Sequence, residues 1–147
     1  VVRASAAELE KTDFVPFRAL ADMPWAMTAH VVYAAYDETQ PATLSGPVID
    51  RVIRGHIGFD GVLVSDDLNM KALDGDVADL AVASIAAGCD IALHCNGALA
   101  EMQRIAAALA PMGAATRDRI ARGVARKGVG PFDGRVALAR LGEIMAA

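Results

Sequence analysis

Three residues with reactive or ligating side chains each follow a short apolar run of this chain: His30, Asp66 and His94. Short apolar runs that lead into helical patterns are typical of buried strands in α/β proteins. The carboxyl ends of parallel strands meet at one edge of a sheet, where such folds keep their active sites. We therefore expect the three side chains at one edge of a parallel sheet, where a carboxylate can act as a nucleophile.

Asp66 is followed at once by a second carboxylate, Asp67. Because side chains alternate along a strand, Asp66 shares a face with Val62 and Val64, whereas Asp67 points to the other face. Two adjacent carboxylates therefore do not flank one substrate bond, and at most one of them points into a site. A helical pattern follows the pair and Asp is a preferred N-cap residue, so Asp67 is predicted to cap a helix.

The segment around the two carboxylates carries a family resemblance. Residues 58–70, Gly-Phe-Asp-Gly-Val-Leu-Val-Ser-Asp-Asp-Leu-Asn-Met, resemble the nucleophile segment of glycoside hydrolase family 3, in its bacterial β-N-acetylhexosaminidase branch. In that family the first Asp of Ser-Asp-Asp-Leu-x-Met is the catalytic nucleophile, which implies this role for Asp66. The β-glucosidase branch has Ser-Asp-Trp instead, so Asp67 and Met70 favour the hexosaminidase branch.

Three strand–helix units are expected to position these residues. This alternation predicts an α/β fold with a parallel sheet and helices outside, and both an open sheet and a barrel fit it. The resemblance implies a partial (β/α)8 TIM barrel, of which these are the last three units, plus C-terminal helices. Phe14, Phe17 and Leu20 recur at helical spacing and are expected in the core. The predicted strands cover residues 25–30, 62–67 and 91–93, and the predicted helices cover residues 5–13, 17–21, 45–57, 77–87, 98–109, 114–127 and 136–145. Ser5 and Ser45 are expected to cap helix starts and Gly88 to end a helix, and residues 128–131 are expected to form a linker.

The chain is too short to close such a barrel. A barrel has eight strands and about 250 residues, whereas this chain has 147 residues and only three predicted strands. Residues 1–147 are therefore predicted to form the C-terminal part of a barrel domain. The strands at its edges would expose unpaired backbone groups, which favours self-association or association with a partner.

Composition and charge argue against several classes of function. The net charge of −4 gives no electrostatic footprint for nucleic acid or for an anionic membrane, and the arginines at 117–126 are interpreted as a solvated helix face. No apolar run of about 18 residues is present, so no membrane span is predicted. Cys89 and Cys95 are interpreted as small buried residues in a reducing compartment. Together with the resemblance, this interpretation predicts a cytoplasmic protein.

The resemblance implies an activity, which is retaining hydrolysis of terminal β-linked N-acetylglucosamine on cell-wall muropeptides or chitin-type oligosaccharides, in peptidoglycan recycling. No metal and no organic cofactor is implied. The resemblance places Met70 near the sugar pocket, and His30 either lines the pocket or is a structural histidine. The family's acid/base, a His held by an Asp, and its sugar-binding Arg and Lys-His residues lie in an earlier part of the barrel that this chain does not match. The chain alone is therefore expected to be nearly inactive.

Two alternatives come from other classes of protein. A metal-dependent barrel hydrolase could use His30, Asp66 and His94 as ligands, although no His-x-His or His-Glu-x-x-His pair is present. Otherwise His94 is interpreted as structural, and His56 as a solvated residue at a helix end. The second alternative is a non-catalytic half-barrel that associates with itself or with a partner.

Overall fold

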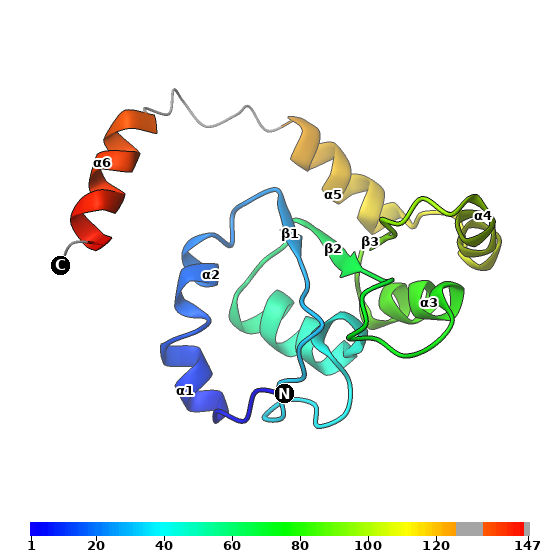
Figure 1. Ribbon diagram of the computed structural model, residues 1–147, viewed down its shortest axis with the longest axis horizontal. Coiled ribbons are helices and arrows are strands. Elements are labelled where there is room, and N and C mark those ends of the chain that lie inside the picture. The colour runs from blue at the N-terminus through cyan, green and yellow to red at the C-terminus, as the bar shows by residue number, and fades with distance from the viewer. Residues whose placement is uncertain (126–133, 146–147) are drawn as a thin grey trace.

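The centre of the chain is a sheet of three parallel strands in sequence order (Figure 1). The computed structural model describes residues 1–125 and 134–145. Val64 in the middle strand pairs with Met27 on one side and with Ile91 on the other, and the second pairing shifts register before Asp67. The order and direction agree with the predicted strand–helix units. The strands are β1 (Trp25–Met27), β2 (Val62–Asp67) and β3 (Ile91–Leu93).

Helices precede the sheet, connect its strands and follow it. In Figure 1, α1 and α2 lie on one side of the strands and α3 and α4 on the other. The observed bounds agree with most of the predicted helices to within a few residues, and a linker predicted at residues 128–131 lies outside the described residues. The helices are α1 (Ala6–Lys11), α2 (Val15–Ala19), η1 (Ala42–Leu44), η2 (Val48–His56), α3 (Val77–Ala87), α4 (Leu99–Ala108), α5 (Ala114–Ala125) and α6 (Gly134–Met145).

The helix between β1 and β2 has a wider turn than predicted. It is a π-helix, and the N–H of Ile57 reaches back five residues to the carbonyl of Val52 at 2.8 Å. Its start agrees with the expected cap, because the Ser45 hydroxyl accepts the N–H of Val48 at 3.2 Å. π-Turns are rare and recur near functional sites, and this one directly precedes the strand that carries Asp66.

The helix predicted directly after Asp67 is not present in the structure. Residues 68–75 form turns, and α3 begins at Val77, where the Asp76 carboxylate accepts the N–H of Ala78 at 2.9 Å. Gly75 has a φ of +134°, which a helix cannot contain, so the helix starts only after it. The prediction that Asp67 caps a helix is therefore wrong.

One face of the sheet is buried under helices. Leu63 of β2 is 1% exposed and packs with Ile49 of η2, with Phe59 and with Cys89. Gly88 ends α3 with a φ of +117°, and a Cβ there would lie only 2.9 Å from Cγ2 of Ile49. Both the backbone angle and the close packing therefore require glycine. Each large apolar side chain buried here stabilises the fold by about 1.5–3 kcal/mol.

Two further clusters join the helices to one another. One joins α3 and α4, and the other joins α1 to η2. The first consists of Leu68, Val77, Ala78, Leu80, Ala81 and Ile105. The second consists of Leu9, Phe14, Ala42, Val48 and Val52.

The opposite face of the sheet is open along β1, although Val62 of β2 on the same face is fully buried. Trp25 and Met27 of β1 are 42% and 56% exposed, although a closed barrel would bury this row of side chains. The expectation that Phe17 and Leu20 are core residues is also wrong, because they are 60% and 53% exposed. They line an apolar cavity of about 310 Å³ between α2, η2 and β1. Within the described residues, three strands are too few to cover these side chains.

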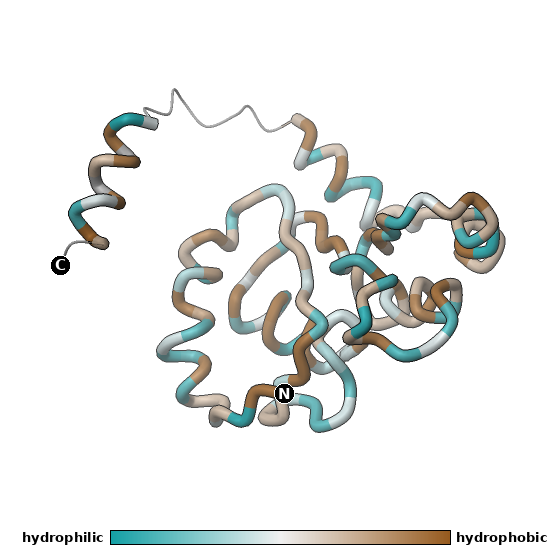
Figure 2. Tube along the Cα trace, viewed as in Figure 1, coloured by the Kyte–Doolittle hydropathy of each residue, from teal (hydrophilic) through white to brown (hydrophobic). Residues whose placement is uncertain are grey.

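Among its described side chains, the last helix contributes none to the clusters defined above. Leu138, Leu141 and Ile144 of α6 are each more than half exposed, and Figure 2 shows apolar and polar residues alternating around this helix. Among the described residues, no helix is long and apolar enough to cross a bilayer.

Candidate active site

Asp66 lies at the carboxyl end of β2 and is partly exposed. Its Oδ1 accepts the N–H of Asp67 at 2.8 Å. Within residues 1–125 and 134–145, Oδ2 of Asp66 has no hydrogen-bond partner. The strand alternation directs the side chain to the open face that Val64 shares. The site therefore presents a carboxylate oxygen that can meet an electrophilic carbon.

Asp67 forms hydrogen bonds with the segments that follow both neighbouring strands. Its Oδ1 accepts the N–H of Asn69 at 3.2 Å and the N–H of Cys95, which follows β3, at 3.1 Å. Its backbone carbonyl accepts the N–H of Met70 at 3.1 Å and Nε2 of His30, which follows β1, at 2.9 Å. Two backbone N–H groups thus bond Oδ1 of Asp67, whereas Oδ1 of Asp66 receives one.

His30 is partly buried against the segment that carries the carboxylates. Its Nδ1 lies 2.8 Å from the hydroxyl of Thr43, and its Nε2 lies 2.9 Å from the carbonyl oxygen of Asp67. Both ring nitrogens therefore have protein partners. A substrate can reach this histidine only at the carbon edge or face of its ring.

His94 lies beside a carboxylate that sequence reasoning missed. Its Nε2 is 3.5 Å from Oε2 of Glu101, in the first turn of α4, and its side chain is 8% exposed. The same Glu101 oxygen accepts the side-chain amides of Asn69 at 3.1 Å and Asn96 at 2.9 Å. The amides of Asn96 and then Asn69 hold the pKa of Glu101 below its ordinary value. An acidic residue in the first turn of the helix after β3 was the only signal of this role in the sequence.

Met70 and the two cysteines occupy different environments. Met70 is 42% exposed in the turn after β2, at the edge where Asp66 lies. Cys89 is buried as predicted, and burial raises the pKa of its thiol to about 11. Cys95 is exposed, so the prediction of a buried residue is wrong for it. Desolvation and then the charges of Asp67 and Asp66 raise the pKa of the Cys95 thiol.

The histidines and carboxylates do not form a metal site. Among the described residues, no group of three or more His, Cys, Asp or Glu side chains is placed to hold a metal ion. The two nitrogens of His30 are already hydrogen-bonded. The geometry therefore gives no support to metal ligation by His30, Asp66 and His94.

His56 is not the solvated residue that the sequence suggested. Its side chain is 25% exposed, and Nδ1 lies 3.8 Å from a carboxylate oxygen of Glu10. Its ring lies 6.1 Å from that of Phe14. The reason is tertiary, because α1 packs back over the end of η2 and covers it.

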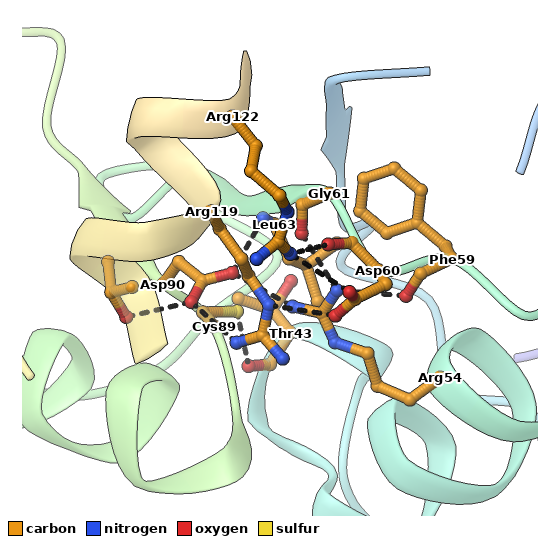
Figure 3. A network of polar contacts seen from close by, with 11 residues as sticks. Thr43, Arg54, Phe59, Asp60, Gly61, Leu63, Cys89, Asp90, Arg119 and Arg122 are labelled. Atoms are coloured by element: carbon orange, nitrogen blue, oxygen red, sulfur yellow. Dashed lines mark hydrogen bonds and ion pairs between the residues drawn. The ribbon is translucent and has the colours of Figure 1, made fainter. Parts of the chain in front are cut away.

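The amino end of the sheet holds a buried ionic network (Figure 3). Asp90, just before β3, has a side chain that is 2% exposed. Its Oδ2 accepts from Arg54 of η2 at 2.8 Å and from the N–H of Leu63 at 2.9 Å. Its Oδ1 accepts from Thr116 at 2.8 Å and Arg119 at 3.0 Å, both on α5. Burial raises the pKa of Asp90, but these hydrogen bonds outweigh burial and hold it below its ordinary value.

The arginines of α5 therefore do more than present a solvated face. Arg119 is 24% exposed and also bonds Asp60 at 3.2 Å, so the interpretation of a purely solvated stripe is wrong for this residue. Arg122 is 58% exposed and pairs with Asp60 at 2.9 Å. Arg126 lies outside the described residues. This network fastens α5 across the starts of β2 and β3.

A parallel sheet with helices packed on one face, and a carboxylate at the carboxyl end of its middle strand, defines the chain as part of an α/β protein. Residues 1–127 match the model of the glycosyl hydrolase family 3 N-terminal domain. The chain therefore belongs to glycosyl hydrolase family 3.

Relatives with known sequences carry one name. The chain is 49% identical over 92 residues to a beta-hexosaminidase of Alkalilimnicola ehrlichii, which covers 60% of this chain and 26% of that protein. It is 42% identical over 110 residues to a beta-hexosaminidase of Pseudomonas aeruginosa, which covers 69% and 33%. The matched region thus spans about a quarter to a third of each relative.

Solved structures share the fold. NagZ from Neisseria gonorrhoeae, in complex with N-trifluoroacetyl-D-glucosamine, is 36% identical with a TM-score of 0.70 over 80% of this chain and 35% of its own. The β-N-acetylglucosaminidase from Thermotoga maritima is 31% identical with a TM-score of 0.66 over 84% and 29%. The predicted partial α/β barrel is confirmed by these matches.

Proposed function

We propose that this chain supplies the nucleophile part of a retaining β-N-acetylglucosaminidase. The substrate class is terminal β-linked N-acetylglucosamine of cell-wall muropeptides or chitin-type oligosaccharides, as in peptidoglycan recycling. The observation that carries the proposal is Asp66, which presents a carboxylate oxygen at the carboxyl end of β2 within Ser-Asp-Asp-Leu-Asn-Met of a family 3 chain. The names of the beta-hexosaminidase relatives and the ligand of the Neisseria gonorrhoeae structure support the sugar.

In the proposed reaction, Asp66 attacks the anomeric carbon and forms a covalent glycosyl-enzyme while the aglycone oxygen leaves with a proton. Water then hydrolyses the intermediate, with the acid acting as a base. The two catalytic groups of a retaining enzyme lie about 5 Å apart. Asp67 cannot be the second group, because its Oδ1 is engaged by two backbone N–H groups and its side chain lies on the other face of β2.

No acid/base is assigned within this chain. His30 has both nitrogens occupied, and His94 lies beside Glu101 and is nearly buried. The proposal therefore places the acid/base, and the residues that hold the sugar's polar groups, in barrel sequence that this chain does not contain. General acid assistance contributes about 10²–10⁴-fold, so the chain by itself is proposed to be nearly inactive. Met70, exposed at the rim, and the ring of His30 are proposed as apolar contacts of the sugar.

The open sheet supports a proposal about assembly. Within the described residues, β1 and β3 are edge strands, and Trp25 and Met27 expose the apolar row that a barrel interior would bury. We propose that residues 1–147 are the C-terminal part of a barrel domain and associate through these edges, with the remaining barrel sequence or with a second copy. A chain that elutes as a monomer at all concentrations in size-exclusion chromatography would contradict this.

The compartment is also a proposal. The two cysteines are unpaired, and Cys95 is exposed. Exposed free thiols suit a reducing compartment, so we propose a cytoplasmic protein. Expression of a fluorescent fusion followed by fractionation tests this.

The decisive experiment measures hydrolysis of an aryl β-N-acetylglucosaminide. This chain is compared with a version that carries the upstream barrel sequence, each with and without Asp66→Ala, and Asp60→Ala at the opposite end of the sheet is the matched control. Activity in the extended protein only, lost with Asp66→Ala by about 10³-fold or more and kept with Asp60→Ala, is expected.

Two results would overturn the assignment. Activity that survives Asp66→Ala would remove this residue from the nucleophile role. Activity lost on chelation would replace the proposal with a metal-dependent mechanism, for which the described histidines and carboxylates show no cluster.

A further inference from the structure

A chain of hydrogen bonds runs from the inside of the sheet to the residue after the proposed nucleophile. The hydroxyls of Thr28 and Thr43 lie 2.9 Å apart, and the Thr43 hydroxyl lies 2.8 Å from Nδ1 of His30. Nε2 of the same ring lies 2.9 Å from the carbonyl oxygen of Asp67. Thr43 is 0% exposed and Thr28 is 5% exposed, so water does not compete for these bonds.

If the His30 ring is neutral, the chemistry of the partners sets the direction of every bond. The carbonyl oxygen of Asp67 can only accept, so the hydrogen must be on Nε2 of His30. In a neutral imidazole Nδ1 then accepts, and the donor is the hydroxyl of Thr43. That hydroxyl has a single hydrogen, so Thr43 must in turn accept from the hydroxyl of Thr28. The Asp67 carbonyl and the hydroxyls of Thr43 and Thr28 together favour one tautomer of His30, in which the hydrogen is on Nε2.

A second contact fixes the middle of the chain of bonds. The thiol of Cys89 donates to the backbone carbonyl of Thr43 at 3.8 Å. Burial keeps this thiol protonated, because it raises the pKa of Cys89 to about 11. Thr43 is therefore held through its backbone as well as its side chain, and it offers His30 a rigid donor.

We infer that His30 is a positioning residue that orients the nucleophile segment as a neutral Nε2–H imidazole. The ring holds the Asp67 carbonyl from the side of β1, and the Asp67 carboxylate holds the Cys95 N–H on the side of β3. Asp67, the residue that follows Asp66, is thus held from both neighbouring strands. Asp66 itself needs only one hydrogen bond, from the N–H of Asp67, and keeps its second oxygen for the substrate. The catalytic meaning of this role rests on the proposed function.

The tautomer can be read directly by NMR on the 147-residue chain with ¹⁵N-labelled histidine. The sequence has three histidines, so spectra of His56→Gln and His94→Gln chains assign the signals of His30. The expected result is a protonated Nε2 and an unprotonated, hydrogen-bonded Nδ1. A protonated Nδ1, or rapid exchange between the two tautomers, would overturn the inference.

Two pairs of variants separate the loss of a hydrogen bond from the loss of side-chain volume. The first pair replaces His30. In His30→Gln the terminal amide nitrogen lies near the place of Nε2 and can still donate to Asp67, whereas the shorter side chain of His30→Asn cannot reach it. The carbonyl ¹³C shift and the amide proton shift of Asp67 are expected to stay as in the original chain for His30→Gln and to move for His30→Asn. Equal shifts in both variants would count against the inference.

The second pair acts at the other end of the ring. Thr43→Ser keeps the hydroxyl donor and Thr43→Val removes it at nearly constant volume. Thr43→Ser is expected to keep the Nε2–H tautomer, and Thr43→Val to lose the preference. A Thr43→Val chain that keeps it would contradict the directed network, and this comparison does not require any His30 variant to fold.

These NMR measurements use no substrate, so they test the role of His30 separately from the proposed function. If the Nε2–H tautomer is found but the protein has no glycosidase activity, His30 still positions Asp67, but this role no longer serves catalysis. Because His30→Asn removes the proposed ring contact with the sugar, it is expected to raise KM in an active upstream-extended protein. In the same variant kcat is expected to fall by about 10-fold to 10²-fold, because the reacting geometry is disturbed. His30→Gln is expected to restore most of that loss.

Discussion

The two ends of the sheet are bonded in opposite ways. At the carboxyl end, Asp66 receives one hydrogen bond, from the next residue in the chain, and keeps an oxygen without a protein partner among the described residues. At the amino end, Asp90 is buried and receives four hydrogen bonds, two of them from arginines. Both aspartates lie at an end of a strand, but only the charge of Asp90 is balanced by arginines.

The contrast shows where this fold places stability and where it leaves reactivity. A buried carboxylate that receives four hydrogen bonds cannot reach a substrate, whereas a partly exposed carboxylate that receives one can. In α/β barrels the carboxyl end of the strands carries the chemistry and the amino end carries stability. The ionic network at the amino end also fastens α5, so it holds the strands from which Asp66 projects. Variants at the two ends should therefore have separable effects.

The largest effect on stability is expected at Asp90. Asp90→Ala leaves Arg54 and the N–H of Leu63 without their buried acceptor, and breaking such a pair costs about 3–5 kcal/mol of unfolding free energy. Urea denaturation followed by circular dichroism measures the change. Asp90→Asn is the matched control, because its amide oxygen can still accept the Leu63 N–H, and it should lose less. An unchanged midpoint in Asp90→Ala would show that the network does not stabilise the fold.

Acid should weaken the same end of the sheet. The pKa of Asp90 is held below its ordinary value in the folded chain, so its contribution is present above the unfolded pKa of about 3.9 and is lost as pH falls through the folded pKa. Asp37 behaves likewise, because N–H groups of Gln40 and Thr39 and the Ser45 hydroxyl lower its pKa to about 2.

The unfolding free energy should therefore fall from about pH 4 down to about pH 2. Urea midpoints measured across this range test the prediction. Asp90→Asn and Asp37→Asn should each flatten part of the slope, and a slope that neither variant changes would assign the acid sensitivity to other groups.

A smaller effect is expected at the exposed edge of the network. The side chain of Asp60 is 73% exposed and pairs with Arg119 and Arg122. Exposed pairs are worth about 0–1 kcal/mol, so Asp60→Ala should lower the unfolding free energy by no more than that. A loss as large as that of Asp90→Ala would mean that α5 depends on its outer contacts.

The smallest effect reports the charge of the proposed nucleophile. Asp66→Asn should change the unfolding free energy by less than about 0.5 kcal/mol, because the amide oxygen can still accept the Asp67 N–H. It should also raise the reaction rate of Cys95 with a disulfide reagent at pH 7.5 by about twofold, because the Asp66 charge contributes to the raised pKa of this thiol. Cys89, which is buried, should stay unreactive until the chain unfolds and serves as the internal control. An unchanged Cys95 rate would mean that Asp66 carries no charge there.

Local patterns in the sequence determined the strands, most helix bounds and the segment that contains the proposed nucleophile. Strand alternation separated Asp66 from Asp67, and Ser5 and Gly88 stand where a helix begins and where one ends. These features depend on neighbours a few residues apart, which is the range over which backbone propensities and side-chain periodicity act. The motif also directed attention to the carboxyl end of β2, where Asp66 lies.

Only the tertiary structure decided which side chains meet across the chain. His30 and Asp67 are 37 residues apart, Arg54 and Asp90 are 36 apart, and Asp60 and Arg122 are 62 apart. Nothing in the sequence near Arg119 distinguishes an arginine in water from one that bonds a buried carboxylate. The roles of Glu101, Thr43 and Asp90, the exposure of Phe17 and Cys95 and the covering of His56 depend on how helices pack on the sheet. Such packing depends on residues that are far apart in the sequence, so local periodicity cannot predict it.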